Sequence, residues 1–549
     1  MDRFYGSSAL AFGKDFLKLK TVLFALNGSY SHTNLAVRAI GHSLRAAGEE
    51  VVIVERNLKD TRLSVLEALV SENADVYGFS VYIWNAEEMY AFAAELKTLL
   101  PRAFLVLGGP EVSFAGTEFF LRHPEADAII AGEGEDAFPH LVRSLAAGED
   151  MRRRVLMAEP YRNFTESGIY YGEIGEEPQG LVYYESVRGC PFSCAYCLSS
   201  ATEGIRAKSA ERALSDLLGF EKFDRIRTVK LVDRTFNFDR ERAKKLWRAL
   251  SEDRYTKEYH FEVSAALLDE ESFLILENAP KGKFRLEIGV QSTNPETLRA
   301  IGRTLDTEKT LAALERLHAK GNLHVHADLI AGLPHEDYAS FARSFDAVYG
   351  KADVLQLGIL KLLRGSRMRC EAEKYGIVYS PNPPYRVLKT AVLSFGELMR
   401  LERIDGFNDR FSNSGKFGFT FPWLAQAYGS PFAFFDGLCD FAEERFSCRE
   451  IARLPQTEAF RLLWEFALET ALPDVGELRE RLALDFLLGE TRRLPPFLHT
   501  DSLGAPEKYR ALSNVEAKRR AACEAVRFPW LSPRIAVVDR VGKTVEFFD

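Results

Sequence analysis

The sequence predicts an α/β protein in which a doubly wound parallel sheet precedes a partial barrel and a mainly helical C-terminal domain. Two series of alternating β-rich runs and amphipathic stretches follow one another within the 549 residues. Such an alternation predicts parallel strands joined by helices. Pro381, Pro383 and Pro384 interrupt it, and a Phe-rich remainder follows. We therefore expect an N-terminal extension (1–19), the sheet domain (20–150), a linker (151–180), the barrel (181–375) and the helical domain (376–549).

The first series has five β-rich runs separated by amphipathic stretches such as Leu35–Ala47 and Asn85–Leu99. Five β-α units of this size predict a doubly wound sheet, whose ligands bind beyond the carboxyl ends of its strands. The residues that follow the runs are therefore the informative ones. The expected strands are Thr21–Leu26, Val51–Glu55, Val76–Val81, Phe104–Leu107 and Ala128–Ala131.

Glycines and polar side chains follow four of these runs. Glycine allows a bulky ligand to approach the backbone closely. Taken singly, each segment is an ordinary β-α turn, and a single histidine in such a turn is more often a surface residue. The candidate binding residues at these turns are Asn27, Ser29, His32, Tyr82, Gly108, Gly109, Pro110, Glu111, Gly132, Glu133, Gly134 and Glu135.

The second series predicts six β-α units, which fit a partial (β/α)6 barrel of the TIM type. Active groups of such barrels cluster at the carboxyl ends of the strands. Polar side chains there need a partner or a ligand when they are buried, although Glu287 and Arg303 could also form an ordinary surface ion pair. The expected strands are Leu181–Val187, Thr228–Val232, His260–Ser264, Arg285–Val290, His324–Ile330 and Val354–Leu360.

A cysteine loop follows the first strand of the second series. Cys190, Cys194 and Cys197 have the spacing C-x3-C-x2-C, and Gly189 and Pro191 break regular structure around them. Three thiolates on one loop can hold three corners of an iron–sulfur cube and leave the fourth iron open. A structural zinc site with a distant fourth ligand is the alternative, but zinc sites favour C-x2-C pairs. The remaining cysteines are scattered: Cys370, Cys439, Cys448 and Cys523.

Composition excludes several classes of protein. Hydrophobic residues make up 46% and charged residues 27%, as in soluble globular proteins, and the net charge of −8 gives no reason to expect a nucleic-acid partner. No apolar run reaches the length of a membrane span, and residues 1–19 lack the apolar core of a secretion signal. Because the cysteines do not suggest a disulfide framework, we expect a cytoplasmic protein.

The cysteine loop, with Tyr196 before its last cysteine, resembles the cluster loop of the radical SAM superfamily. The turns Gly108-Gly-Pro-Glu111 and Gly132-Glu-Gly-Glu135 resemble the cobalamin-binding domain of the B12-binding class of that superfamily. The layout resembles a subgroup with a C-terminal domain of unknown function (DUF4080-like). The Asp-x-His-x-x-Gly motif of many cobalamin domains is absent, since Tyr30 and Leu35 stand where its Asp and Gly would be. The resemblance therefore implies cobalt without a histidine ligand.

This resemblance implies three cofactors: a [4Fe–4S] cluster on the three loop cysteines, S-adenosyl-L-methionine (SAM), and cobalamin at the turns of the first sheet. It identifies no catalytic residue beyond the cluster cysteines. A sulfonium substrate that carries a carboxylate suits an Arg fork, and its ammonium group suits a carboxylate. The residues that the resemblance assigns to SAM are Tyr196, Asp233, Asn237, Glu262, Ser264, Glu287, Gln291, Arg303 and Ile330.

The function implied by the resemblance is methylation of an unactivated carbon through a 5′-deoxyadenosyl radical and methylcobalamin. A non-methylating oxidation or rearrangement is one alternative, and a non-catalytic cobalamin- or metal-binding sensor is another. A flavodoxin- or ferredoxin-type protein would donate the electron.

The C-terminal domain, with the expected helices Val387–Leu401, Ala459–Leu468 and Ala517–Ala525, carries Phe clusters that suit core packing or a wall over the substrate. A small molecule, a peptide and a lipid all remain open as substrates.

Overall fold

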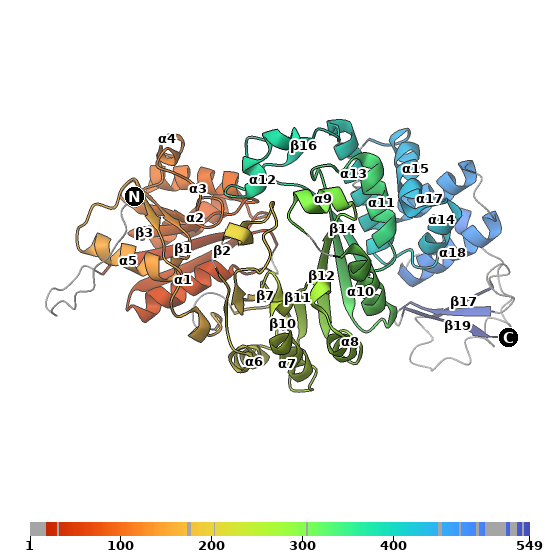
Figure 1. Cartoon of the computed structure of the whole chain (residues 1–549), viewed down its shortest axis with the longest axis horizontal. Helices are drawn as coiled ribbons and strands as arrows, with labels where there is room; N and C mark the ends of the chain where they lie inside the picture. The colour runs from red at the N-terminus through yellow and green to blue at the C-terminus, as the bar shows by residue number, and fades with distance from the viewer. Residues whose placement is uncertain are drawn as a thin grey trace.

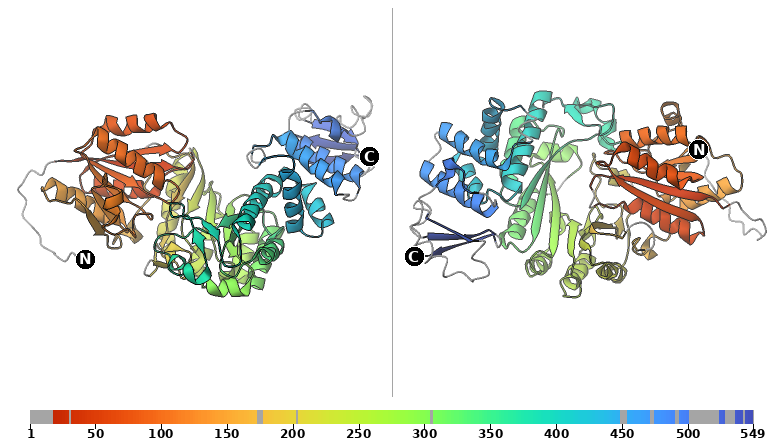
Figure 2. Two further views of the ribbon diagram at one scale, coloured as in Figure 1. Left: turned by 90° about the horizontal axis from the view of Figure 1, so that it is seen from above. Right: turned by 180° about the vertical axis from the view of Figure 1, so that it is seen from behind.

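A computed structural model shows the three predicted parts arranged along the long axis of the molecule, with the N-terminal sheet at one end and the helical domain at the other (Figure 1). Figure 2 shows the barrel between them from two further sides. The predicted fold class is confirmed. The structure describes residues 18–29, 32–172, 177–201, 204–303, 306–447, 453–470, 474–489, 493–499, 523–527, 535–540 and 543–548.

The first sheet is parallel and six-stranded, in the order β2-β1-β3-β4-β5-β6. All five predicted strands are present, and β6 is an addition within the segment expected to be a linker. With only four residues, Arg-Val-Leu-Met, at the edge of the sheet, β6 is too short for a periodic signal. The strands are β1 (Lys20–Asn27), β2 (Glu50–Asn57), β3 (Val76–Ser80), β4 (Phe104–Gly108), β5 (Ala128–Ala131) and β6 (Arg154–Met157).

Helices cover both faces of this sheet, and each face has its own apolar core. The helix α1 begins where the Asn34 side chain accepts a hydrogen bond from the Val37 N–H, which satisfies one of the free donors of the first turn. This helix and α5 pack on one face, and α2 and α3 pack on the other. The helices are α1 (Leu35–Ala46), α2 (Arg62–Glu72), α3 (Ala86–Leu99), α4 (Phe119–Arg122) and α5 (Gly134–Ala146).

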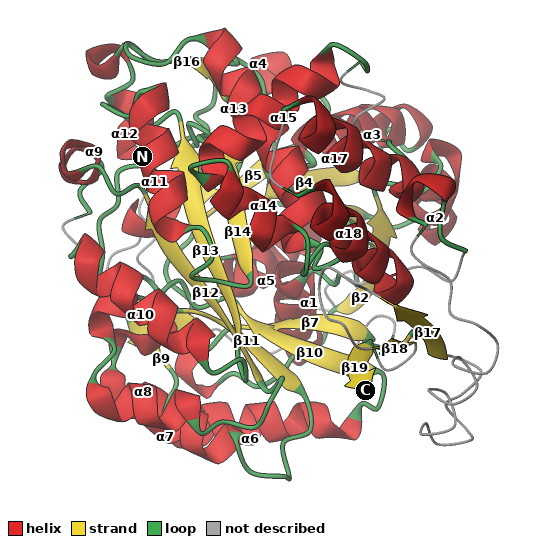
Figure 3. Ribbon diagram, turned by 90° about the vertical axis from the view of Figure 1, so that its right-hand side faces the viewer, coloured by secondary structure: helices red, strands yellow, loops and turns green. Residues whose placement is uncertain are grey.

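The second sheet is also parallel and six-stranded, in the order β14-β13-β12-β11-β10-β7. It curls into an open barrel with helices on its outer side (Figure 3). The strands are β7 (Gly180–Tyr184), β10 (Ile226–Leu231), β11 (Glu258–Glu262), β12 (Phe284–Gln291), β13 (His324–Ala331) and β14 (Val354–Ile359). The helices are α6 (Ala210–Gly219), α7 (Arg240–Leu250), α8 (Glu270–Glu277), α9 (Pro295–Ala300), α10 (Thr307–Ala319), α11 (Tyr338–Val348) and α12 (Arg367–Cys370).

The predicted strand Leu181–Val187 is divided in two. Its first part is β7, whereas Val187 begins β8 (Val187–Arg188), which pairs with β9 (Arg206–Ala207) in a separate antiparallel ribbon. The cysteine loop connects β8 to β9. The chain therefore leaves the barrel sheet at Glu185 and forms a hairpin whose long loop carries the three cysteines.

The helical domain begins after a small two-stranded ribbon, β15 (Val378–Tyr379) with β16 (Val387–Lys389). The predicted helix Val387–Leu401 is therefore wrong in its first part: β16 occupies the start, and α13 begins only at Phe395, where Ser394 is the N-cap and forms a capping box with Glu397. The predicted helix Ala459–Leu468 is confirmed within α17. The helices are α13 (Phe395–Asn408), α14 (Phe421–Ala427), α15 (Pro431–Glu443), α17 (Gln456–Glu469) and α18 (Val475–Gly489).

An antiparallel sheet near the C-terminus was not predicted. It consists of β17 (Cys523–Arg527), β18 (Ile535–Asp539) and β19 (Thr544–Phe548). The predicted helix Ala517–Ala525 is wrong over its last three residues, which form β17, and residues 517–522 lie outside the described part of the chain. Pairing with β18, a tertiary contact that local propensity does not contain, decides this segment.

The Phe clusters of the helical domain form its core. The side chains of Phe417, Phe421, Phe434 and Phe435 are all buried, and the rings of Phe421 and Phe435 stack with centroids 4.9 Å apart. Aromatic rings in such contacts stabilise a core beyond their buried area. Among the described helices, none is long and apolar enough to cross a membrane.

The helical domain also closes the free edge of the barrel sheet. An exposed edge strand presents unpaired backbone groups. Here the Leu357 N–H donates to Asp405 Oδ1 at 3.2 Å, and the Leu355 carbonyl accepts from Asn408 Nδ2 at 2.6 Å. Side chains of α13 therefore replace the neighbouring strand that β14 lacks.

Candidate active site between the two sheets

A cavity of about 830 Å³ lies between the carboxyl edge of the first sheet and the barrel. This volume is near the upper end of the range for small-molecule and cofactor sites. The first sheet contributes residues from the turns after β1, β3, β4 and β5. The barrel contributes the side chains of Tyr183, Glu185, Arg188, Lys230, Val232, Arg234 and Glu262. The cavity is therefore closed by two domains, each through its strand ends.

Most of the turn residues predicted from the sequence line this cavity. They are Asn27, His32, Tyr82, Gly108, Gly109, Pro110, Gly132, Glu133, Gly134 and Glu135. Gly109 has φ +110°, and a Cβ atom there would lie 2.5 Å from the Val81 carbonyl oxygen. Only glycine fits this turn, because a side chain would collide with the backbone of Val81.

Two of the predicted turn residues lie elsewhere. Ser29 lines a smaller polar pocket of about 320 Å³ beside the cavity. Glu111 is buried and points toward the chain that follows the barrel, where Arg364 Nε donates to Glu111 Oε1 at 3.0 Å and the Tyr385 hydroxyl donates to the same oxygen. Burial raises the pKa of Glu111, against the effect of these two partners.

His32 is close to the barrel side of the cavity. Its ring centroid lies 5.9 Å from that of Tyr183. Burial and the nearby charge of Lys230 lower the pKa of His32. The imidazole is therefore neutral at physiological pH.

Backbone hydrogen bonds from two neighbouring elements hold the cysteine loop. The Ala195 N–H donates to the Ile301 carbonyl at 2.8 Å, and the Met368 N–H donates to the Ala195 carbonyl at 2.8 Å. At the start of the loop Gly189 has φ +93°, and a Cβ atom there would lie 2.1 Å from the Gly204 carbonyl oxygen. The glycine lets the two ends of the loop approach each other.

The three thiols lie close enough to influence one another. Burial raises the pKa of Cys194, Arg303 lowers it, and the thiolates of Cys197 and Cys190 raise it further. The Cys190 Sγ lies 3.3 Å from the Thr235 hydroxyl. Within the described residues, no three His, Cys, Asp or Glu side chains converge closely enough to hold a single metal ion. A cubane cluster instead distributes its cysteine ligands over separate irons, so a loop of three neighbouring thiols fits it.

Polar side chains at the barrel strand ends adjoin the cysteine loop. Arg303 donates to the Tyr196 hydroxyl from Nη1 at 3.2 Å and to the Gly289 carbonyl from Nη2. Ser264 Oγ and Gln291 Oε1 are buried and have no hydrogen-bond partner within the described chain. A buried polar atom without a partner is costly, and a polar ligand at these strand ends would satisfy both.

Glu287 lies inside the barrel between two basic side chains. Lys230 Nζ is 2.9 Å from Glu287 Oε2, and His260 Nε2 is 3.1 Å from the same oxygen. Burial alone would raise the pKa of Glu287, but the contacts with His260 and Lys230 outweigh it and lower the pKa to about 2. Glu287 is therefore ionised and paired within the barrel, and not paired with Arg303 on the surface.

Two further carboxylates of the barrel have raised pKa values. Burial raises the pKa of Glu262, although Arg234 stands 3.8 Å from it. Burial, together with the charges of Glu287 and Glu262, raises the pKa of Asp328 to about 7. Ile330, on the same strand as Asp328, packs against the main apolar core.

Asp233 and Asn237 hold backbone in place. Asp233 is completely buried, and its Oδ1 accepts from the N–H groups of Ser186 at 2.7 Å and Val187 at 2.9 Å. Asn237 donates to the Ser264 carbonyl and accepts from the Ser264 N–H, both at 2.9 Å. Asp233 thereby fixes the start of the cysteine hairpin, and Asn237 fixes the end of β11.

Sequence reasoning missed several residues of the site. Lys230 and His260 were overlooked. Lys230 stands two residues before Val232 and His260 two residues before Glu262, and residues two apart on a strand point to the same face. Arg188 and Arg206 were also missed, and both bind glutamates of the first domain. The position of Arg188 directly before Gly189 and Cys190 was the available signal.

Family models match each of the three parts of the chain. Residues 22–142 match the B12 binding domain, residues 184–348 match the radical SAM superfamily, and residues 373–527 match a protein family of unknown function, DUF4080. The predicted resemblance is confirmed for each part.

Curated relatives match about half of the chain. A 2-(S-pantetheinyl)-carbapenam-3-carboxylate methyltransferase of Streptantibioticus cattleyicolor is 27% identical over 308 residues, which are 49% of this chain and 44% of that protein. The cobalamin-dependent radical SAM methyltransferase TokK of Streptomyces tokunonensis is 25% identical over 358 residues, 57% of this chain and 50% of that protein. The chain thus spans about half the length of these two relatives.

Solved structures share the fold. The radical SAM methyltransferase TsrM from Kitasatospora setae, with cobalamin and a [4Fe–4S] cluster bound, has a TM-score of 0.56 at 18% identity over 67% of this chain and 82% of that chain. The cobalamin-dependent SAM radical enzyme OxsB, with aqua-cobalamin and SAM bound, has a TM-score of 0.57 at 16% identity over 85% and 78%.

Proposed function

We propose that this chain, which joins B12-binding, radical SAM and DUF4080 segments, is a cobalamin-dependent radical SAM methyltransferase that acts on an unactivated carbon. The observation that carries the proposal is the shared cavity. Its one wall is the carboxyl edge of a B12-binding sheet, and its other wall is the strand ends of the barrel. The three cysteines do not line it, but Arg188, from which their loop begins, does. A radical methyl transfer needs both cofactors to meet one substrate, and this cavity is where the two domains meet.

Each cofactor has residues that suit it. Cys190, Cys194 and Cys197 would hold the [4Fe–4S] cluster, and the glycine turns of the first sheet would hold cobalamin. Tyr196, Arg303, Glu262, Ser264 and Gln291 would hold SAM: Arg303 contacts Tyr196 of the cysteine loop, Glu262 lines the cavity, and Ser264 and Gln291 have buried oxygens without a partner in the described chain. When bound, these cofactors supply the electron, the 5′-deoxyadenosyl radical and the methyl group.

The protein's own residues position these groups. Arg303 links the cysteine loop to β12 through its bonds to Tyr196 and Gly289. Asp233 holds the base of the loop. Inside the barrel, Glu287 is paired with Lys230 and His260. Such fixed polar groups need no rearrangement during the reaction, which is how a preorganised site lowers a barrier.

The test is an anaerobic reconstitution of the whole chain with iron, sulfide and cobalamin. We expect about four irons per chain, a visible spectrum changed by bound cobalamin, and 5′-deoxyadenosine after reduction in the presence of SAM. Cys190→Ala should lose the cluster and the 5′-deoxyadenosine. Cys370→Ala removes an exposed cysteine outside the loop and is the matched control, so it should keep both.

The outcome separates the proposed function from its alternatives. Methyl-labelled SAM that yields a labelled product supports methylation, whereas 5′-deoxyadenosine with an unlabelled, altered substrate indicates oxidation or rearrangement. Bound cobalamin without any 5′-deoxyadenosine indicates a sensor. Retained turnover in Cys190→Ala would refute the assignment of the cluster. A flavodoxin- or ferredoxin-type donor and a small-molecule, peptide or lipid substrate belong to the same proposal.

A further inference from the structure

The base of the cysteine hairpin carries two arginines directly opposite each other. Arg188 of β8 pairs with Arg206 of β9, and the loop between them contains all three cluster cysteines. Like charges directly opposite each other on neighbouring strands repel. The arginine pair therefore needs anions beside it, and the first domain provides them.

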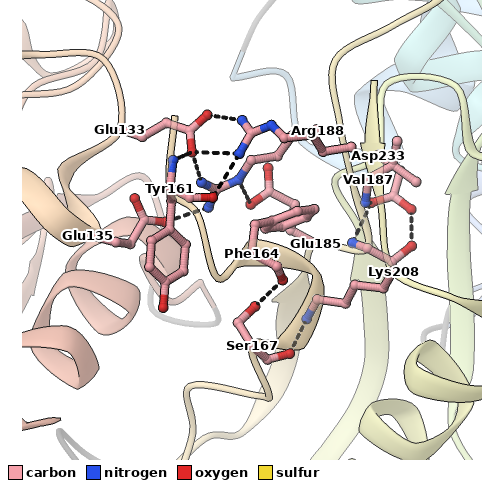
Figure 4. A network of polar contacts seen from close by, with 12 residues as sticks. Glu133, Glu135, Tyr161, Phe164, Ser167, Glu185, Val187, Arg188, Lys208 and Asp233 are labelled. Carbon is pink, nitrogen blue, oxygen red and sulfur yellow. Dashed lines mark hydrogen bonds and ion pairs between the residues drawn. The ribbon is translucent and has the colours of Figure 1, made fainter. Parts of the chain in front are cut away.

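The anions come from the turn after β5. Glu133 accepts from Arg188 and Arg206 at once, and Arg206 Nη1 lies 3.3 Å from Glu133 Oε2. Arg188 Nη2 donates to Glu135 Oε1 at 2.5 Å. Within the barrel domain, Arg188 Nε donates to Glu185 Oε2 at 2.9 Å. Figure 4 shows the two glutamates of the first domain converging on Arg188. We call Glu133, Glu135, Arg188 and Arg206 the hairpin clamp.

The contact between Arg188 and Glu135 is shielded from water, whereas Arg206 and Glu133 are about a quarter exposed. Arg188 is 12% exposed and Glu135 is 6% exposed. The Arg188 guanidinium also lies over the Phe164 ring, 4.5 Å from its centroid. The two glutamates stand at the N-terminus of α5, where the helix dipole favours negative charge. Buried charges of this kind hold a geometry firmly, because moving one away would leave its partner unpaired.

The same turn faces the cavity. Gly132 and Gly134 line it together with the two clamp glutamates and Arg188. Gly132 has φ +103°, so the turn has a backbone shape that most residues adopt only with strain. Any ligand that orders Gly132 and Gly134 therefore also orders Glu133 and Glu135, and through them the base of the cysteine hairpin.

From this arrangement we propose that the hairpin clamp is a positioning device that couples occupation of the cavity by cobalamin to the position and stability of the cluster loop. The inference rests on the proposed function for the identity of the two cofactors. Arg188 is its central positioning residue. Coupling between two binding sites is reciprocal, so the cluster should strengthen cobalamin binding by the same factor by which cobalamin stabilises the cluster.

A second contact between the domains provides a matched control. Glu111, in the turn after β4, accepts from Arg364 and Tyr385 in the segment that follows the barrel. This contact joins the first domain to the end of the barrel through Arg364 and to the start of the helical domain through Tyr385, and it includes no residue of the cysteine hairpin. Glu111→Gln should therefore loosen the domain contact without breaking the connection to the cluster loop.

The experiment measures the coupling in both directions on the full reconstituted chain. Cluster loss to an iron chelator is followed by absorbance with and without cobalamin, and cobalamin binding is titrated by its visible spectrum with and without the cluster. In the wild type we expect each cofactor to favour the other roughly 5- to 150-fold, the usual range for coupled sites. In Arg188→Gln the ratio should fall to about one, and in Glu111→Gln it should stay within about twofold of the wild type.

Two further variants keep the test decisive. Arg188→Lys retains the charge but not the forked geometry, so it should recover only part of the coupling. Glu135→Gln is nearly isosteric and serves if Arg188→Gln fails to fold, which circular dichroism would reveal. Equal coupling in the wild type and in these clamp variants would overturn the inference, as would a wild type that binds both cofactors without coupling. A wild type that binds neither cofactor would instead overturn the proposed function and the inference with it.

Discussion

Replacing Asp233 should separate two tasks that one carboxylate performs at the start of the cysteine hairpin. Its Oδ1 accepts both backbone N–H groups, from Ser186 and Val187, whereas its Oδ2 accepts from the Ser186 hydroxyl. That hydroxyl accepts in turn from Arg242 Nη2 at 2.7 Å. Oδ1 therefore holds the backbone, and Oδ2 connects the network to a buried cation.

The two substitutions remove different parts of this arrangement. Asp233→Ala leaves two buried N–H groups without an acceptor, at about 1–3 kcal/mol each, and leaves Arg242 without its anion. The two N–H groups alone should therefore cost roughly 2–6 kcal/mol. Asp233→Asn keeps an oxygen for both N–H groups and loses only the charge. The new amide N–H group would face the Ser186 hydroxyl, so that two donors meet, at a cost of about 1–3 kcal/mol.

The assay combines urea unfolding, followed by circular dichroism, with the iron content after anaerobic reconstitution. We expect Asp233→Asn to be moderately destabilised and to assemble the cluster, because Val187 stays in place. We expect Asp233→Ala to be more unstable and to lose most of its iron. The reasoning is refuted if Asp233→Ala unfolds within 1 kcal/mol of the wild type (on the order of the cost of a surface substitution) or if the two variants lose iron equally.

Three other perturbations test separate parts of the structure. The basic partners of Glu287 lower its pKa to about 2. The ionised Glu287 should therefore add roughly 3 kcal/mol to the free energy of unfolding above pH 4.5, and this contribution disappears as the pH falls toward 2. In Glu287→Gln, the free energy of unfolding should lack this dependence on acid pH. The pKa of Asp328 is raised to about 7, so its ionisation opposes folding as the pH rises from about 4 to 7. Asp328→Asn should therefore raise the melting temperature at pH 8 but not at pH 4, and no difference between the two pH values would contradict the raised pKa. Gly109→Ala places a Cβ 2.5 Å from a carbonyl oxygen and should abolish cobalamin binding in a spectral titration. Gly148→Ala is the control: Gly148 has φ +81° but open space around it, so this variant should cost only about 1–3 kcal/mol of backbone strain.

Local sequence patterns determined most of the architecture. The β-α alternation located all five predicted strands of the first sheet and the strands of the barrel, because a buried parallel strand needs a run of apolar or β-branched residues. It missed β6, whose side chains are largely exposed, and it misplaced β16 and β17, whose conformation depends on pairing with β15 and β18. Strands of three to five residues are too short for their apolar residues to show a period.

The sequence by itself also determined the functional groups available to the site, namely three thiols on one loop and glycines at the ends of strands. Only the tertiary structure decided which partner each polar side chain meets. Glu111 and Glu133 lie in similar glycine-rich turns, yet one binds Arg364, far along the chain, and the other binds Arg188 and Arg206 at the cysteine hairpin. Spacing along the chain reports on neighbours within a turn, whereas an ion pair across two domains depends on how those domains pack. The residues that join the two halves of the site therefore became visible only once both domains were folded against each other.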